Sequence, residues 1–158
     1  MVTIPEVTSK TSKRDILQFM RSQSLAVQAS VSPSGVPQAA VVGFVVTDTF
    51  EIIFDTTDAT RKVHNLRNNP SISFVIGGMT AGDERTVQYE GTVDEPQGKE
   101  LEYLREIYFA AFPEGRERLN WRGLIHMRVR PLWLRFCDFN QTPPEVVEFS
   151  FVEQTGAA

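Results

Sequence analysis

Cysteine and long hydrophobic runs are both scarce in this sequence. Its 158 residues include one cysteine, Cys137, so no disulfide can form within the chain. A chain without disulfides suits a reducing compartment, and we expect a cytoplasmic protein. No apolar run approaches the roughly 20 residues that span a bilayer. The N-terminus, MVTIPEVTSKTSKRD, also lacks the apolar segment of a secretory signal, so we expect no membrane partner.

Histidines and the common glycine motifs are also few. His64 and His126 are the two histidines, and with Cys137 they match no known zinc-ligand spacing, so we expect no metal. Neither a P-loop nor a G-x-G-x-x-G sequence occurs. The formal net charge of −4 disfavours nucleic acid as a partner, because neutralisation of phosphates dominates that binding.

The bulk composition is that of a globular protein, with 41% hydrophobic and 23% charged residues. A chain of this length buries one good core. We therefore predict a single domain over 1–158, with a loose N-terminal arm over 1–12 and a C-terminal extension over 139–158.

The hydrophobic pattern predicts a mainly β, α+β fold of antiparallel strands with a few helices. Short β-branched runs predict the strands, and helical periodicity predicts the helices. Gly91 is expected at a bulge, Pro131 at an edge, bend or bulge, and the tail Pro143–Phe151 as an edge strand or a cover for a partner subunit. The predicted helices are Lys13–Arg21, Ala59–Asn68 and Gln97–Phe112, and the predicted strands are Leu25–Val31, Gln38–Val46, Glu51–Thr56, Ser71–Ile76, Thr86–Val93 and Leu124–Asp138.

Chemistry is expected at the start of the helix Ala59–Asn68. Thr57 or Asp58 can cap this helix, and its predicted buried stripe is Ala59, Val63 and Leu66. That stripe turns Arg61 and Lys62 away from the core.

Two cations in a first helical turn are unfavourable, because the helix N-terminus already carries a partial positive charge. A bound anion reverses this effect, and Arg61 and Lys62 would then grip a phosphate together with backbone N–H groups and threonine hydroxyls. The alternative is that Asp55 and Asp58 pair with the two cations. Spacing alone favours these ion pairs.

The order of the elements adds a resemblance. The segments Ala29–Gln38, Thr56–Leu66 and Asn69–Ser73, in this order, resemble the pyridoxamine 5′-phosphate oxidase-like family of FMN-binding split β-barrels. The resemblance covers roughly Leu17 to Asp138 and is most specific from Ser30 to Phe74.

The resemblance implies a flavin mononucleotide (FMN) in a cleft between the two subunits of a homodimer. Thr60, Arg61 and Lys62 look like the family's phosphate clamp, and Thr56 like its strand-end threonine. The segment from Gln38 to Val42 looks like the strand along the flavin ring, and Thr86 lies where the oxidase has a flavin-contacting glutamine. The expected cofactor-binding residues are Gln38, Ala40, Val41, Thr56, Thr57, Thr60, Arg61, Lys62 and Thr86.

Two departures separate this sequence from the true oxidase. A lysine of the oxidase is replaced near Gly43, and the C-terminal Arg-Leu-His-x-Arg motif is absent, with the segment from Phe139 to Glu145 in its place. We therefore expect an FMN-dependent oxidoreductase with a small-molecule substrate or electron donor, but not a pyridoxamine phosphate oxidase. The sequence does not identify its catalytic residues. The alternatives are a non-catalytic flavin-binding sensor and a reductase that uses a deazaflavin. The lack of a well-placed histidine argues against haem.

Other residue types suggest weaker candidates. Cys137 is expected as a small buried hydrophobe and Trp133 in the core or a dimer interface. Trp121 is the better candidate for a ligand-contacting wall.

Overall fold

The computed structural model describes residues 10–151. These residues form a curved antiparallel sheet with three α-helices and one 3-10 helix around it. The helices are α1 (Lys13–Ser22), α2 (Arg61–Asn68), α3 (Gly98–Ala111) and the 3-10 helix η1 (Pro113–Asn120). The strands are β1 (Leu25–Val31), β2 (Pro37–Gly43), β3 (Val45–Val46), β4 (Ile52–Thr57), β5 (Ser71–Gly77), β6 (Arg85–Asp94), β7 (Leu124–Asp138) and β8 (Glu145–Ser150).

The sheet curls into a barrel that stays open along one line. Its strand order is β2-β1-β5-β6-β7-β4-β3, with β8 paired to β7 outside this path. The edge strand β2 comes close to β4, but no hydrogen-bonded pairing joins the two strands. The fold is therefore a split β-barrel, as the sequence predicts, and the split lies between β2 and β4.

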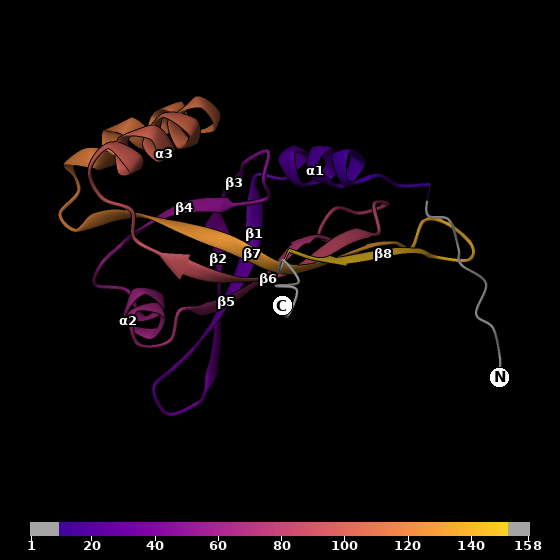
Figure 1. The fold of residues 1–158 in the computed structure, drawn as a ribbon, viewed down its shortest axis with the longest axis horizontal. Helices are drawn as coiled ribbons and strands as arrows, with labels where there is room; N and C mark the ends of the chain where they lie inside the picture. The colour runs from indigo at the N-terminus through magenta and orange to yellow at the C-terminus, as the bar shows by residue number, and fades with distance from the viewer. Residues whose placement is uncertain (1–9, 152–158) are drawn as a thin grey trace, which may run out of the picture.

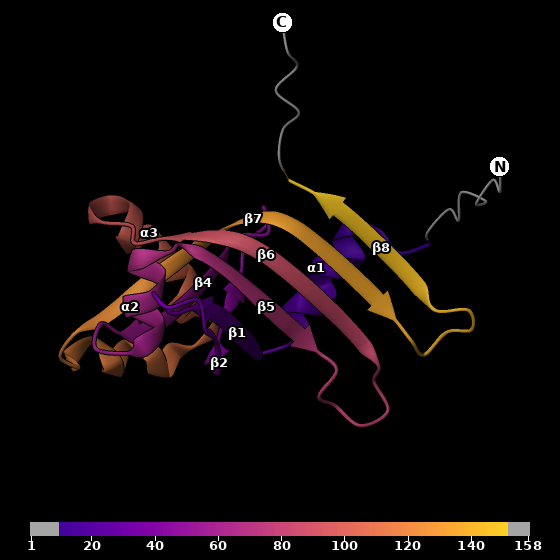
Figure 2. The same cartoon turned by 90° about the horizontal axis from the view of Figure 1, so that it is seen from below.

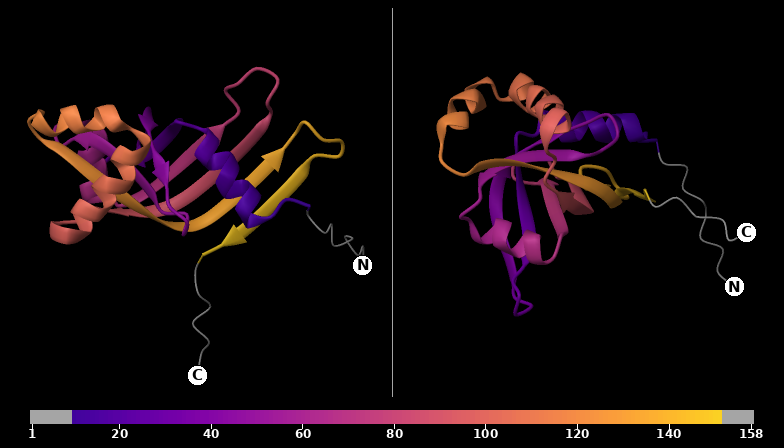
Figure 3. Two further views of the ribbon diagram at one scale, coloured as in Figure 1. Left: turned by 90° about the horizontal axis from the view of Figure 1, so that it is seen from above. Right: turned by 60° about the vertical axis from the view of Figure 1, so that its left-hand side comes forward.

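The helices lie on both sides of this sheet. Figure 1 shows α1 and α3 on one side and α2 on the other, and the right-hand view of Figure 3 agrees. Within residues 10–151, no helix is long and apolar enough to span a membrane.

Alternation along the strands builds the core. In β6, Val87, Tyr89 and Val93 are buried and point into the barrel. The ring of Phe74 contacts those of Phe54 and Tyr89 edge to face. Such contacts stabilise a core beyond the area they bury, and they bind β4, β5 and β6 together beneath the split.

The predicted bulge at Gly91 is confirmed. The register between β6 and β7 shifts between Glu90, which pairs with Trp133, and Gly91, which pairs with Pro131. A Cβ on Gly91 would lie 2.6 Å from the carbonyl oxygen of Arg130, so only glycine fits there. The same bulge accommodates Pro131 within the long strand β7.

The prediction of one strand over Gln38–Val46 is wrong, because the chain changes neighbours at Phe44. The strand β2 pairs with β1 as far as Gly43, and β3 then pairs with β4. The backbone N–H of Phe44 donates to the carbonyl of Ser24, and the Phe44 ring is buried. Burial of this ring turns the chain and opens the barrel beside β2.

The predicted start of α2 is also wrong. The N-cap is Thr60 rather than Thr57 or Asp58, and the helix begins at Arg61. Ala59 is exposed, whereas Val63 and Leu66 are buried as expected. The backbone N–H of Asp58 bonds instead to the carbonyl of Gly123, which holds the preceding turn away from the helix.

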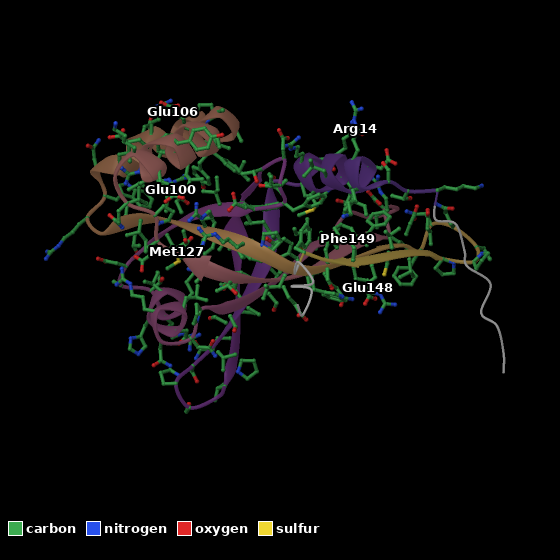
Figure 4. All side chains as sticks on the ribbon, in the orientation of Figure 1. Arg14, Glu100, Glu106, Met127, Glu148 and Phe149 are labelled. Carbon is green, nitrogen blue, oxygen red and sulfur yellow. The ribbon has the colours of Figure 1, made fainter. Side chains whose placement is uncertain are left out.

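The chain ends pack along one edge of the sheet. Strand β8 extends the sheet beside β7, as expected for the tail, and Figure 2 shows the two strands side by side. In Figure 4, Glu148 and Phe149 point to opposite sides of β8. In the expected N-terminal arm, Thr11 donates two hydrogen bonds to Glu145, and Ser12 caps α1. Residues 1–9 of this arm and residues 152–158 of the expected C-terminal extension lie outside the described residues.

Candidate functional site

A polar hollow of about 290 Å³ lies at the split, between the β1–β2 hairpin and the start of α2. We call it the clamp hollow. Strand β1 contributes Gln28 and Ser30, strand β2 contributes Gln38, Ala39 and Ala40, and the α2 end contributes Thr60, Arg61 and Lys62.

A second hollow of about 450 Å³ adjoins the first, with Thr60 in the wall of both. We call it the aromatic hollow, because Tyr108, Phe112 and Trp121 line it. Thr56 and Thr57 at the end of β4 also line it. The remaining lining residues are Leu25, Gly43, Asp55, Glu114, Arg118 and Leu124.

The N-terminus of α2 is unusual in its charges. Its cap residue Thr60 makes no side-chain hydrogen bond to the helix, and no acidic residue lies in the first turn. Helix α1 also begins with two cations, but Ser12 and Asp15 form a capping box there. The first N–H groups of α2 therefore lack the compensation that α1 has.

The two cations in the first turn of α2 also lack an acidic partner among the described residues, whereas Arg67 in the last turn pairs with Glu95. Among residues 10–151, no carboxylate forms an ion pair with Arg61 or Lys62. The sequence-based alternative of pairing with Asp55 and Asp58 is therefore not what the structure shows. Asp55 instead accepts from Arg118 at 2.8 Å.

Lys62 and two threonines form a small polar network at the strand end. Lys62 Nζ donates to Thr56 Oγ1, at 3.3 Å, and Thr56 Oγ1 lies 3.3 Å from Thr60 Oγ1. Burial lowers the pKa of Lys62 from its ordinary value. An anion bound beside this ammonium would favour its charged form, so the network is suited to an anionic ligand.

A polar layer forms the floor of the clamp hollow. The buried Asn65 of α2 donates through Nδ2 to Ser30 Oγ, at 3.1 Å, and to Gln38 Oε1, at 2.9 Å. These bonds hold α2 against the hairpin. Gln28 lies next in this layer, opposite Ala40, with 1% of its surface exposed.

Sequence reasoning missed Gln28. Its Oε1 atom is buried and accepts no hydrogen bond from any described residue. The signal was available in β1, where Ala26, Gln28 and Ser30 share the inward side of an alternating strand. A long polar side chain at an inward position requires a partner.

Charged and aromatic groups combine in the aromatic hollow. The Tyr108 hydroxyl donates to Asp55 Oδ1, at 2.9 Å, and Arg118 Nε donates to Asp55 Oδ2. Burial raises the pKa of Tyr108, and the Asp55 carboxylate raises it further, so this phenol stays protonated at neutral pH. The Phe112 ring stacks on that of Tyr108, and Trp121 is an exposed part of the wall, as expected.

The structure brings together seven of the nine predicted cofactor-binding residues. Gln38, Ala40, Thr60, Arg61 and Lys62 line the clamp hollow, and Thr56 and Thr57 line its neighbour. Val41 lies on the other face of β2, where 59% of its surface is exposed. Thr86 lies in a separate hollow of about 340 Å³ on the outer face of the sheet, with Trp133.

The remaining chemical candidates lie apart from the clamp. Cys137 is buried, as predicted. His126 is buried between Tyr108 and Phe109, and burial lowers its pKa to about 4. His64 is exposed on α2. Within 10–151, no group of three potential ligands could hold a metal ion.

The fold is a split barrel with a cationic hollow at its opening, and comparisons with known proteins identify its family. The model of the family described as pyridoxamine 5′-phosphate oxidase matches residues 12–135. The chain therefore belongs to the pyridoxamine 5′-phosphate oxidase-like family, as the sequence analysis predicts. A comparison with curated protein sequences gives no match.

Solved structures share the fold at low sequence identity. A pyridoxamine 5′-phosphate oxidase-related, FMN-binding protein from Nostoc punctiforme superposes with a TM-score of 0.70 at 13% identity, covering 92% of this chain and 94% of that one. A conserved hypothetical protein from Mycobacterium tuberculosis gives 0.71 at 21% identity, covering 98% and 100%. A heme-binding protein from Mycobacterium smegmatis superposes with a TM-score of 0.76 at 16% identity. The match covers 89% of this chain and 59% of the heme-binding protein.

Proposed function

We propose that this protein binds FMN at the split and acts as a flavin-dependent oxidoreductase. The observation that carries the proposal is the pair Arg61 and Lys62, which lies at an uncapped helix N-terminus with no carboxylate partner among the described residues. A phosphate monoester satisfies both cations and the free N–H groups at once. The FMN-binding relative from Nostoc punctiforme supports this choice of ligand.

Each part of the cleft has a role in this proposal. Arg61, Lys62 and Thr60 hold the phosphate, and strand β2 supports the ring system. The aromatic hollow at the end of β4 receives the far end of the ring and the substrate. When bound, FMN supplies hydride or electron transfer, while the chain positions the ring and limits water around it.

A second subunit completes the cleft in this proposal. The hollow of the outer face that holds Thr86 shares no lining residue with the clamp hollow within one chain, whereas the hollow that holds Leu132 shares Ser30 with it. Strand β2 also exposes Val41 and two alanines at a sheet edge, which a soluble protein normally covers. A homodimer would cover these surfaces and bring the partner's Thr86 toward the flavin.

The direct test compares FMN with riboflavin, which has the same ring and side chain without the phosphate. Titration of the protein into each flavin, followed by flavin fluorescence and visible absorbance, should show binding of FMN at least about a hundredfold tighter than that of riboflavin. Equal binding of both would contradict the clamp, and no binding of FMN would contradict the proposed function.

Turnover separates an enzyme from a flavin-carrying sensor. An oxidoreductase should oxidise NADH or NADPH in the presence of an electron acceptor, and the rate should depend on added FMN. A protein that binds FMN without such turnover with any donor tested would support the sensor alternative. Tight binding of a deazaflavin cofactor in place of FMN would support the deazaflavin alternative, since the same clamp can hold its phosphate.

Haem binding is a second candidate, favoured by the similarity to the Mycobacterium smegmatis heme-binding protein. Of the two histidines, His126 is buried among aromatic rings, and only His64 on α2 is exposed to an approaching iron. A haem titration followed by the Soret band, with wild type and His64→Ala, tests this candidate. A shifted Soret band that disappears in His64→Ala would favour haem over FMN.

A further inference from the structure

Gln28 is a buried amide in the clamp hollow that has no hydrogen-bond partner in the described part of the chain. Its Oε1 atom is buried and has no hydrogen-bond partner among the described residues, and the side chain lines the hollow. An unsatisfied buried amide destabilises a protein and calls for an explanation. In this hollow, the explanation is a bound group that pairs with the amide.

Neighbouring residues cannot supply that pairing. Both protons of the Asn65 amide are already committed to Ser30 and Gln38. The residue opposite Gln28 in the hairpin is Ala40, whose methyl group offers no polar atom. The chain itself therefore leaves this amide unpaired at the wall of the hollow.

The chemistry of the amide narrows the class of ligand. A carboxylate or a phosphate has only acceptor oxygens, so it can satisfy the NH₂ end but leaves the carbonyl unpaired. A hydroxyl group both donates and accepts, so it satisfies either end of the amide, whichever way the amide lies. An imide N–H would satisfy the carbonyl alone.

The position of Gln28 selects between these groups. Gln28, Arg61 and Lys62 line the same hollow of about 290 Å³, so a chain attached to a phosphate on the two cations would share the hollow with Gln28. We infer that Gln28 hydrogen-bonds a hydroxyl group beside the phosphate, so that the clamp hollow selects a phosphorylated polyol chain. This inference rests on the proposed function, because the side chain of FMN is such a polyol phosphate. A haem, whose polar edge carries only carboxylates, offers no hydroxyl.

The test is the variant Gln28→Met, which keeps the size of the side chain and removes both polar atoms. FMN affinity should fall about tenfold, and the affinity for D-ribitol 5-phosphate, measured by calorimetry, should fall equally. Affinity for inorganic phosphate should stay within twofold. The matched control is Gln18→Met on the exposed face of α1, which should change none of these affinities.

Thermal stability gives a second measurement that a purely structural role would not reproduce. Replacing an unpaired buried amide by a methionine should leave the melting temperature of the ligand-free protein unchanged or raise it. A lower melting temperature with unchanged FMN affinity would overturn the inference.

The outcomes separate the inference from the proposed function. If wild type and Gln28→Met bind FMN equally, the inference fails and the FMN proposal stands. If wild type binds D-ribitol 5-phosphate in a Gln28-dependent manner but not FMN, the inference stands and the FMN proposal fails. If wild type binds neither compound, both fail.

Discussion

Arg118 Nε lies 2.8 Å from Asp55 Oδ2, so an ion pair joins the helix η1 to the end of β4. Both side chains are mostly shielded from water. The pair compensates the negative charge of Asp55, which lies on the strand that leads into the clamp. We therefore expect the ion pair to prevent the charge of Asp55 from weakening anion binding at the clamp.

This relationship predicts that the two halves of the ion pair have different effects on ligand binding. Arg118→Ala leaves an uncompensated carboxylate in the aromatic hollow and should weaken FMN binding about threefold to tenfold. Asp55→Asn breaks the same pair but removes the negative charge, so FMN affinity should hold or improve. Each change should lower the free energy of unfolding by about 1 to 2 kcal/mol, measured by urea titration.

The double variant Asp55→Asn with Arg118→Ala is the control for this prediction. It lacks the uncompensated charge and should recover the FMN affinity of wild type. Equal losses of affinity in both single variants would mean that the ion pair acts by shaping η1 and not through charge.

The clamp itself predicts a separation of ligand affinity from stability. The double variant Arg61→Ala with Lys62→Ala should weaken FMN binding about a hundredfold, because it removes two charge-assisted contacts to the phosphate. The stability of the ligand-free protein should hold or rise by a few tenths of a kcal/mol, since two cations leave a positive helix end. Fluorescence titration and urea denaturation measure the two quantities.

Helix α1 supplies a matched control for the clamp. Lys13 and Arg14 also occupy the first two positions of a helix, but a capping box lies beside them. Arg14 points away from the sheet in Figure 4. Changing both to alanine should leave FMN affinity within twofold of wild type. A large loss of FMN affinity in this control would mean that the effect of the clamp variant comes from the net charge of the protein and not from contacts to the phosphate.

The buried His126 predicts a loss of stability in acid. Burial, with help from the Arg105 cation, lowers its pKa from an ordinary value of 6.5 to about 4. Between these pH values the unfolded chain binds a proton that the folded protein does not. The free energy of unfolding should therefore fall as pH decreases from 6.5 to about 4, by about 1.4 kcal/mol per pH unit and about 3 kcal/mol in total.

Two histidine variants isolate this effect. In His126→Gln, the slope of unfolding free energy against pH between 4 and 6.5 should be smaller than in wild type by about 1.4 kcal/mol per pH unit. In His64→Gln, the exposed histidine is removed and the slope should match that of wild type. Identical slopes in all three proteins would contradict a neutral buried His126.

The sequence predicts the bounds of several strands better than the shape of the split. Strands Leu25–Val31 and Leu124–Asp138 and the bulge at Gly91 follow from local composition and turn chemistry, and the structure reproduces them. The break at Phe44 does not follow, because it lies in a continuous apolar run. Only the tertiary burial of its ring decides where the chain leaves β1 for β4.

The candidate site was predictable where local chemistry determines it. Arg61 and Lys62 stand out in the sequence because two cations conflict with a helix N-terminus. Gln28 was missed because its significance depends on its burial and on the lack of a partner, which are both tertiary properties. The separation of Thr86 from the clamp within one chain likewise depends on how the whole sheet curls.

Gly91 predicts a local limit on side-chain size. A Cβ there would lie 2.6 Å from the Arg130 carbonyl oxygen and from a methyl carbon of Val129. Gly91→Ala should therefore lower the free energy of unfolding by about 1 to 3 kcal/mol. The control is Gly43→Ala, where the nearest atom, on Phe112, would be at an ordinary 3.5 Å, and the loss should be well below 1 kcal/mol. Urea denaturation of both variants decides the matter.

The outer face of the sheet predicts a dimer contact. Val75 and Leu132 are exposed at 45% and 42%, and the two hollows that they line share Ser73 and Glu90. Exposed apolar side chains gathered on one face mark an interaction site. Light scattering at micromolar concentration should therefore give twice the mass of the chain, and Leu132→Glu should give a monomer that keeps its circular dichroism spectrum.

If the cofactor lies between subunits, loss of the dimer must also reduce cofactor affinity. Leu132 lines neither the clamp hollow nor the aromatic hollow, so Leu132→Glu removes no ligand contact within its own chain. FMN affinity of this variant should nevertheless fall at least about tenfold and recover in part at high protein concentration, because association and binding are linked. The control Tyr103→Glu, exposed at 63% on α3, should stay dimeric and bind FMN normally. A monomeric Leu132→Glu with wild-type affinity would show that one chain forms the whole FMN site.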